Sequence, residues 1–125
     1  MFKFALGQPV TVLLAGRSGT TAAIAAQTVY LNGSTQYGIE YINTKGVVDY
    51  ATVQEQHLVS SEGGHQNAPY DFKFELGSDV QITTVDKPGT VIGARRVHGG
   101  QTQYVVAYDG GGTHCEAWIE ESLLA

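Results

Sequence analysis

The sequence FKFALGQPV at residues 2–10 returns as FKFELGSDV at residues 72–80, and this repeat decides the fold. The shared residues are mostly aromatic, aliphatic or glycine. At a spacing of 70 positions, Phe2, Lys3, Phe4, Leu6, Gly7 and Val10 align with Phe72, Lys73, Phe74, Leu76, Gly77 and Val80. Self-similarity at a fixed spacing is typical of a duplicated structural unit. The chain is therefore expected to contain two copies of one small module.

The repeat extends through most of the chain. Its further matches are Val12 with Ile82, Gly19-Thr20 with Gly89-Thr90, residues 33–41 with 100–108 after a three-residue gap, and residues 53–58 with 118–123. The segment SSEGGHQNAPYD between the copies is rich in turn and coil residues. We predict a first unit over residues 1–59, a linker over 60–71 and a second unit over 72–125.

Short apolar runs separated by turn sequences predict β-strands in both copies. The expected strands are residues 10–14, 22–31, 35–42 and 47–53, followed by 80–85, 90–97, 102–109 and 115–119. The alanines of residues 22–31 are also compatible with a helix, but the aligned segment IGARRVH is not alanine-rich, which favours a strand. Asn32-Gly33 and Pro88-Gly89 are expected to form hairpin turns. The fold class predicted is all-β, with two tandem SH3-like small barrels related by internal duplication.

Composition limits the possible partners. The chain has 42% hydrophobic and 15% charged residues with a net charge of −5, and the acidic surplus lies after residue 60. Long nucleic acid is disfavoured as a partner, because phosphate binding needs clustered Lys and Arg. No run approaches the roughly 18 apolar residues of a membrane span. The apolar start is interrupted at Gly7-Gln8-Pro9 and at Arg17, so it predicts a strand and not a signal peptide.

Catalytic and metal-binding patterns are not apparent in the sequence. His114 and Cys115 are adjacent, which places them on opposite faces of a strand. The four histidines are well separated and form no H-x-H or H-x-x-x-H pattern. DGGGTH at residues 109–114 resembles an anion-binding loop, but no helix follows it, which favours a hairpin tip. We predict neither enzymatic activity nor a metal or cofactor.

Two groups of side chains are candidates for binding. Arg95 and Arg96 are neighbours on a predicted strand, so their side chains face opposite sides. They either form a surface pair that balances nearby acidic residues, or one of them binds an anionic group. The residues aligned with them are Ala25-Ala26, so the module itself does not require arginine there.

Tyrosines at period two form one face of each of two strands: Tyr37 and Tyr41, and Tyr104 and Tyr108. They either fill the core or an interface, which we favour, or form a ligand cage.

The pattern F-x-LG-x-x-V…YLNG-x-x-QY…W-x-x-E-x-L resembles a family of small bacteriophage proteins with an SH3-like fold. The matching residues in the first copy are Phe4, Leu6, Gly7, Val10, Gly16, Gly19, Tyr30-Leu31-Asn32-Gly33 and Gln36-Tyr37. Those in the second are Phe74, Leu76, Gly77, Val80, Gly89, Val91, Gln103-Tyr104, Glu116-Ala117, Trp118, Glu121 and Leu123. The first copy lacks the tryptophan, and the second has VHGG where the family has YLNG. The resemblance implies an SH3-like fold and a phage origin, and it brings no catalytic residue.

These observations lead to two functional hypotheses. The first is a non-catalytic phage protein that sequesters a small anionic host ligand, such as a nucleotide second messenger of bacterial immunity, in the host bacterial cytoplasm. The candidate ligand-binding residues are Arg95, Arg96, His98, Tyr104, Trp118, Tyr37 and Arg17. The alternative is a virion protein, for head decoration, head–tail connection or the tail, that binds other phage or host proteins. Two marginal barrels with many tyrosines also favour a homo-oligomer.

Overall fold

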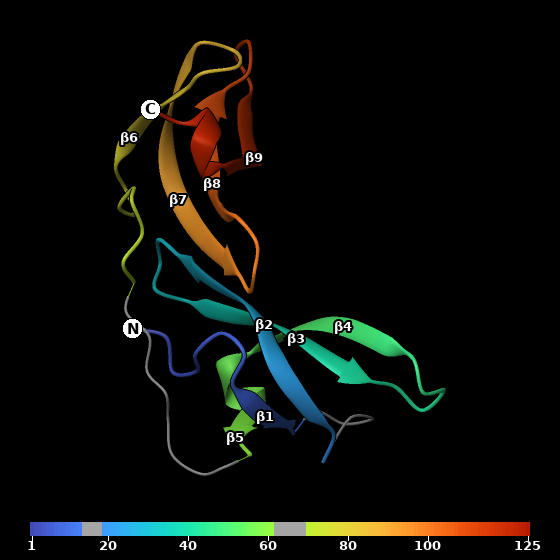
Figure 1. Cartoon of the computed structure of the whole chain (residues 1–125). Coiled ribbons are helices and arrows are strands. Elements are labelled where there is room, and N and C mark those ends of the chain that lie inside the picture. Colours follow the sequence, from blue (N-terminus) through green and yellow to red (C-terminus); the bar gives the residue numbers. More distant parts are fainter. Residues whose placement is uncertain (14–18, 62–69) are drawn as a thin grey trace. The chain divides into compact units, whose positions relative to one another are not determined.

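The computed structural model describes residues 1–13, 19–61 and 70–125, and within these residues its regular structure consists of strands and two 3₁₀ turns (Figure 1). The all-β prediction is confirmed. The described residues group into two compact units. The first comprises Met1–Gln27 and Thr35–Tyr70, and the second comprises Thr28–Ser34 and Asp71–Ala125.

The first unit is an antiparallel sheet that curls around an aromatic and aliphatic core. Its elements are β1 (Pro9–Val12), most of β2 (Thr21–Tyr30), β3 (Thr35–Ile42), β4 (Val48–Gln54), the 3₁₀ turn η1 (Glu55–His57) and β5 (Leu58–Ser60). β1 pairs with both β2 and β5, and β3 lies between β2 and β4. Phe2, Phe4 and Tyr37 are fully buried. The rings of Phe4 and Tyr37 are in edge-to-face contact, with 5.4 Å between their centroids.

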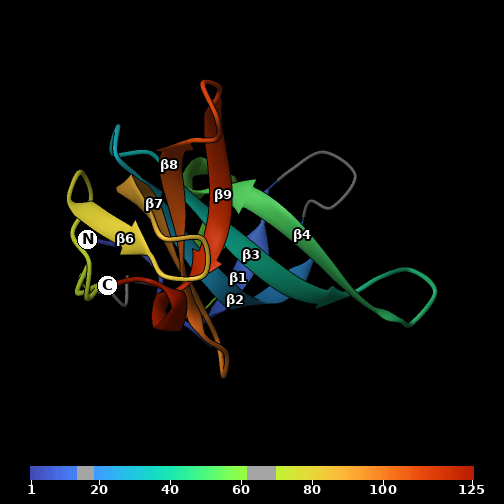
Figure 2. The same ribbon diagram turned by 90° about the horizontal axis from the view of Figure 1, so that it is seen from above.

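The second unit has the same kind of sheet. Its elements are β6 (Asp79–Ile82), β7 (Lys87–Val97), β8 (Thr102–Asp109), β9 (His114–Glu120) and the 3₁₀ turn η2 (Glu121–Leu123), and they appear in yellow to red in Figure 2. β6 pairs with β7, β7 with β8 and β8 with β9, all antiparallel. After η2 the chain returns to β6 through a bridge between Ile82 and Leu124. Thr28–Ser34 belongs to this unit, in which the Leu31 N–H donates to the Ile92 carbonyl at 2.8 Å.

Most strands lie where the sequence pattern places them. β3 and β8 have the predicted bounds of residues 35–42 and 102–109, and the alanine-rich segment forms the strand β2. β5 is not among the strands predicted from the sequence. It has three residues, of which Leu58 alone is buried, so it shows no alternating pattern that could identify it.

The prediction of a turn at Pro88-Gly89 is wrong. Both residues lie within β7, where they pair with Gln81 and Val80. The turn comes earlier, after Ile82, and uses Asp86 at a φ of +52°. Gly89 serves close packing, because a Cβ at this position would collide with Cγ1 of Val106 and lie 3.0 Å from the carbonyl oxygen of Ala107.

Strand pairing gives a correspondence between the two units that differs from the alignment predicted from the sequence. Val10 pairs with Ala22, and the aligned residue Val80 pairs with Gly89. The three-residue difference therefore lies before β2, in the loop that follows β1. Counted from this pairing, Arg95 and Arg96 correspond to Thr28 and Val29, and not to Ala25-Ala26.

One local arrangement occurs in both units. Tyr37 and Tyr104 are fully buried, and each hydroxyl accepts a backbone N–H, from Lys3 at 2.9 Å and from Phe74 at 3.3 Å. Each hydroxyl also donates to a carboxylate of the 3₁₀ turn, at 3.5 Å for Glu55 and 2.7 Å for Glu121. The ring of Phe74 lies 5.3 Å from that of Tyr104, close to the Phe4–Tyr37 value. A buried tyrosine thus links the N-terminal segment to the 3₁₀ turn in each unit.

Candidate ligand-binding surface around Trp118

The outer face of β7, β8 and β9 presents two rows of side chains. Strand pairing aligns Gly93 with Val105 and Trp118 in one row. The next row contains Arg95, Gln103 and Glu120. The side chains of alternate residues share a face of a sheet, so these two rows are neighbours on the same face.

A β-bulge determines which arginine reaches this face. The β7–β8 register shifts between Val91 and Gly93, so Ile92 is an additional residue in β7. Val91 and Ala94 are both fully buried on the core side, which places Gly93 and Arg95 on the outer side. A bulge reverses the alternation beyond it. Without Ile92 as the extra residue, Arg96 and not Arg95 would share a face with Trp118.

Arg95 and Trp118 are in direct contact. The guanidinium carbon of Arg95 lies 4.4 Å from the centroid of the Trp118 ring. Its Nε donates to Oε1 of Gln103 at 3.2 Å, and its Nη2 donates to the same oxygen. Trp118 keeps 39% of its surface exposed. A cation over an indole face is an attractive arrangement that also holds the guanidinium in a defined plane.

Tyr30 extends the aromatic surface beyond Trp118. Its ring contacts the Trp118 ring edge-to-face, with 6.4 Å between centroids. A Cβ on Gly93 would lie 2.9 Å from Cδ1 of Tyr30, so the tyrosine ring rests on the glycine. The ring next to Trp118 therefore depends on the absence of a side chain at residue 93.

A shallow hollow of about 540 Å³ lies beside Tyr30. It is lined by Tyr30, Leu31, Asn32, Ser34 and Ile92. The Asn32 carboxamide oxygen accepts both the backbone N–H and the hydroxyl of Ser34, at 3.0 and 2.7 Å, and Gly33 takes a φ of +87°. The turn predicted at Asn32-Gly33 is confirmed, and it holds one wall of the hollow.

Carboxylates flank the aromatic residues on this face. Glu116 and Glu120 are two residues before and after Trp118 on β9, so they share its side of the strand. Glu116 Oε2 lies 2.9 Å from Nε2 of His114. Arg95 is the one arginine or lysine in the two paired rows, so an anionic group on them would be attracted to Arg95.

Arg96 lies on the other side of β7 and is already paired. Its Nη2 lies 2.6 Å from Oδ1 of Asp71, and its guanidinium carbon lies 4.7 Å from the centroid of the Phe72 ring. This hydrogen-bonded ion pair lowers the pKa of the Asp71 carboxyl. Arg96 thus joins the start of the second unit to β7.

The two tyrosines proposed for the site are core residues by position. Tyr37 and Tyr104 are fully buried, and Tyr37 belongs to the other unit from Arg95 and Trp118. Burial raises the pKa of both phenols to about 12, and the carboxylates of Glu55 and Glu121 add to the shift. Each hydroxyl is therefore held neutral as a hydrogen-bond donor.

The other two proposed residues are His98 and Arg17. His98 is exposed in the turn between β7 and β8, beyond the paired rows that contain Arg95 and Trp118. Arg17 lies outside the described residues. Of the seven residues predicted from the sequence, the structure brings Arg95 and Trp118 together.

The hairpin at residues 109–114 forms a tight tip. Gly111 and Gly112 both have positive φ, and the Gly110 N–H donates to the Thr113 carbonyl at 2.8 Å. The Gly112 N–H donates to Oδ1 of Asp109 at 2.7 Å. Two amides of the loop therefore already have acceptors, and the acceptor of the Gly112 N–H is a carboxylate that would repel an anion.

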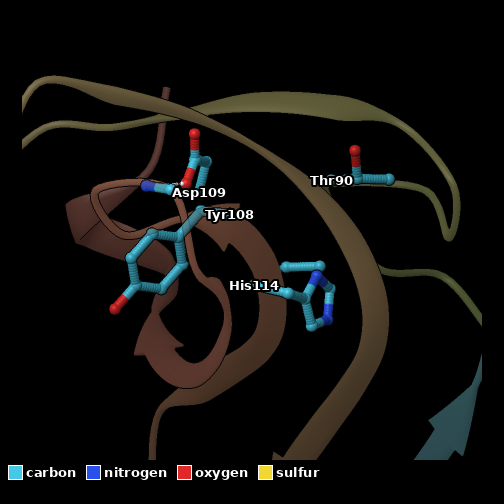
Figure 3. Close-up of a pocket in the computed structure, with 6 residues that line it drawn as sticks. Thr90, Tyr108, Asp109 and His114 are labelled. Carbon is cyan, nitrogen blue, oxygen red and sulfur yellow. Dashed lines mark hydrogen bonds between the residues drawn. The ribbon is translucent and has the colours of Figure 1, made fainter.

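A second hollow, of about 510 Å³, lies beside this tip. Its lining includes Thr90, Asp109 and His114, and Figure 3 shows that the Tyr108 ring points away from Thr90 and His114. Its described lining residues include the Asp109 carboxylate and no arginine or lysine, and the nearby Lys87 ammonium already donates to the Asp109 carbonyl at 3.3 Å. It is a poorer site for an anion than the surface around Arg95.

Comparisons with protein-family models, with curated proteins and with solved structures gave no match for this chain. Among the residues that the structure describes, no helix is long and apolar enough to cross a membrane.

Sequence reasoning left two contributors to this surface unassigned. Gln103 holds the Arg95 guanidinium, and Gly93 makes room for Tyr30. Gly93 gives no signal in the sequence because its role depends on a ring that is distant along the chain. Gln103 was recognised only as part of the repeated Gln-Tyr pair.

Proposed function

We propose that the protein is a non-catalytic binding protein that sequesters a small nucleotide-like ligand at the surface around Trp118. The observation that carries this proposal is the contact of an exposed indole with the Arg95 guanidinium, 4.4 Å from the ring centroid. Indole rings stack on bases, and guanidinium groups bind phosphate through paired N–H donors. The two recognition groups needed for a nucleotide are adjacent here.

The flanking carboxylates restrict the ligand. Glu116 and Glu120 disfavour a polyphosphate spread over the whole face, because like charges repel. They are suited to accept hydrogen bonds from ribose hydroxyls or from an amino group of a base. The ligand that fits best has an anionic group at Arg95, a base on Trp118 or Tyr30, and sugar hydroxyls towards β9.

The fold supports a more specific assignment. Each unit has its strands in one antiparallel order with a 3₁₀ turn before the final pairing, which is typical of SH3-like barrels, and the Tyr37 and Tyr104 contacts match closely. These features support two tandem SH3-like modules derived by duplication. Together with the sequence resemblance, they support a phage protein that acts in the host bacterial cytoplasm on a nucleotide second messenger of immunity.

Fluorescence of the single tryptophan offers a direct test, because Trp118 is the only one in the chain. The protein is titrated with ADP-ribose, cyclic mononucleotides and cyclic dinucleotides while the emission of Trp118 is followed. A saturable change with one of them, together with a rise in the melting temperature, is the expected result. No change in emission or melting temperature with any of them would contradict the proposal.

Arg95 and Arg96 form a matched pair of variants for this titration. We expect Arg95→Gln to weaken binding by at least about tenfold, as is usual for loss of a charge-assisted contact. Arg96→Gln breaks the ion pair with Asp71 on the other side of β7 and is expected to leave the affinity unchanged. Equal losses from both variants would show that the arginines act through general charge and not through this site.

A second candidate function is favoured by the exposed apolar residues of the first unit. Ile42, Val47, Val48 and Tyr50 are all exposed by 46% or more near the β3–β4 turn. Exposed apolar clusters of this kind mark protein interfaces. A virion protein would use such a surface in head decoration, connection or the tail, and detection of the chain in purified particles would favour this function over ligand sequestration.

A further inference from the structure

The β3–β4 hairpin has an edge that is open to pairing. Figures 1 and 2 show it extending away from β1, β5 and η1 of the same unit. β4 pairs with β3 along its whole length, and within the described residues it ends the strand order of the sheet. Its other edge therefore presents backbone N–H and C=O groups without a strand neighbour in that unit.

The hydrogen-bonding pattern identifies which residues form this edge. The Asn43 N–H donates to the Val47 carbonyl at 2.9 Å. Antiparallel pairs alternate between bonded and non-bonded positions, so the backbone groups of alternate β4 residues point away from β3. These outward residues are Val48, Tyr50, Thr52 and Gln54. The Tyr50 N–H indeed bonds the Asp49 carboxylate at 2.9 Å instead of a β3 carbonyl.

The matching edge in the second unit carries more charge than this one, whose one charged residue is Asp49. By the same alternation, the outward residues of β9 are His114, Glu116, Trp118 and Glu120, which include two carboxylates. Natural sheets use charged side chains to keep edge strands from associating. The outward residues of β4 are all uncharged, and Val48 and Tyr50 are 46% and 66% exposed.

We propose that the β4 edge pairs with β4 of a second copy of this chain, antiparallel and about a two-fold axis at Tyr50. This register places Tyr50 opposite Tyr50 and Val48 opposite Thr52 of the other copy. It places Asp49 opposite the uncharged Ala51 and brings Lys45, in the turn before β4, opposite Glu55, just after β4. Shifting the axis to Asp49 would instead set two carboxylates against each other, and shifting it to Ala51 would lose the Lys45–Glu55 complementarity.

Pairing has one local cost. The Tyr50 N–H must leave Oδ1 of Asp49 and donate to the Tyr50 carbonyl of the other copy. One hydrogen bond is therefore exchanged for another. The other backbone N–H and C=O groups on the open edge of β4 gain partners, and the exposed side chains of Val48 and Tyr50 become covered. A two-fold interface forms each contact twice, which strengthens it.

A cysteine on the proposed axis tests the register. In a Cys115→Ser background, the Tyr50→Cys variant is exposed to mild oxidation. Directly opposed bonded residues of antiparallel strands have Cα atoms about 5.5 Å apart, within the range of a disulfide. We expect a disulfide-linked dimer. Glu116→Cys, at the matching position on β9, is expected to remain a monomer in the same oxidation.

Charge reversal supplies a second test, read by sedimentation equilibrium. Lys45→Glu sets two carboxylates together at each end of the interface and is expected to raise the dimer dissociation constant by about tenfold or more. Adding Glu55→Gln removes this repulsion, keeps an acceptor for the Tyr37 hydroxyl, and is expected to recover most of the loss. A monomeric parent protein, or cross-linking as efficient at Glu116→Cys as at Tyr50→Cys, would overturn the proposal and leave the β4 edge to another protein.

Discussion

The Arg95 guanidinium lies over the Trp118 ring, with 4.4 Å between its central carbon and the ring centroid. Gln103 holds the guanidinium from β8, and the Tyr30 ring contacts the indole edge-to-face. The bulge at Ile92 is the reason for the contact, since it turns Arg95 to the outer face. A partly exposed indole in contact with a held guanidinium is the feature on which the proposed binding function rests.

Gly93→Ala is expected to disrupt the aromatic surface. The new methyl group would lie 2.9 Å from Cδ1 of Tyr30 and 3.3 Å from Cγ2 of Val105, so the Tyr30 ring has to move. Overpacking of this kind usually costs about 1–3 kcal/mol. We expect a lower melting temperature and a shift in Trp118 emission. Adding Tyr30→Ala should restore much of the stability but not the emission; a Gly93→Ala protein with unchanged emission would show that Tyr30 does not rest on Gly93.

Tyr104→Phe is expected to destabilise the second unit. The variant removes the hydroxyl that accepts from the Phe74 N–H and donates to Glu121 at 2.7 Å. Loss of a buried hydrogen-bonded group costs about 1–3 kcal/mol when its partners are left unpaired. Urea unfolding of the variant measures this loss. Glu121→Gln keeps an acceptor for the phenol and should be milder; equal stability of Tyr104→Phe and the parent would contradict a structural role for the hydroxyl.

The stability of the protein is expected to fall at alkaline pH. The pKa of Tyr37 and of Tyr104 is raised from 10.0 to about 12, so the folded state retains phenolic protons that the unfolded state loses. Stability from these groups is fully present below about pH 10 and is lost as the pH rises from about 10 towards 12. Chemical denaturation across this range measures the slope. Tyrosinate absorbance should show late titration of Tyr37 and Tyr104, and burial also raises the pKa of Tyr70. The Tyr37→Phe/Tyr104→Phe double variant should have a flatter stability profile across this pH range.

Gly89→Ala tests the corrected position of the β6–β7 turn. A methyl group at residue 89 would collide with Cγ1 of Val106, so we expect a loss of about 1–3 kcal/mol in the free energy of unfolding. Gly89 has no positive φ, so backbone strain does not contribute to this loss. An alanine variant as stable as the parent would mean that Gly89 lies in an open turn, as the Pro-Gly sequence suggested.

Local patterns in the sequence determined the strands and most turns of this protein. Alternation in TQYGIEYI and TQYVVAYD identifies β3 and β8, because a half-buried strand requires a period of two. Asn32-Gly33 identifies a turn because glycine accepts the positive φ found there. Sequence pattern also predicted that one arginine of Arg95-Arg96 would face away from the other.

Only the tertiary structure decided which arginine meets Trp118 and which tyrosines are buried. The bulge at Ile92 reverses the faces of Arg95 and Arg96, and Asp71 pairs with Arg96 from a segment 25 residues away along the chain. Gly89 and Gly93 are needed because of Val106 and Tyr30, which approach them through strand pairing and packing. Such contacts depend on the register between distant segments, and register follows from loop closure and core packing and not from local propensity.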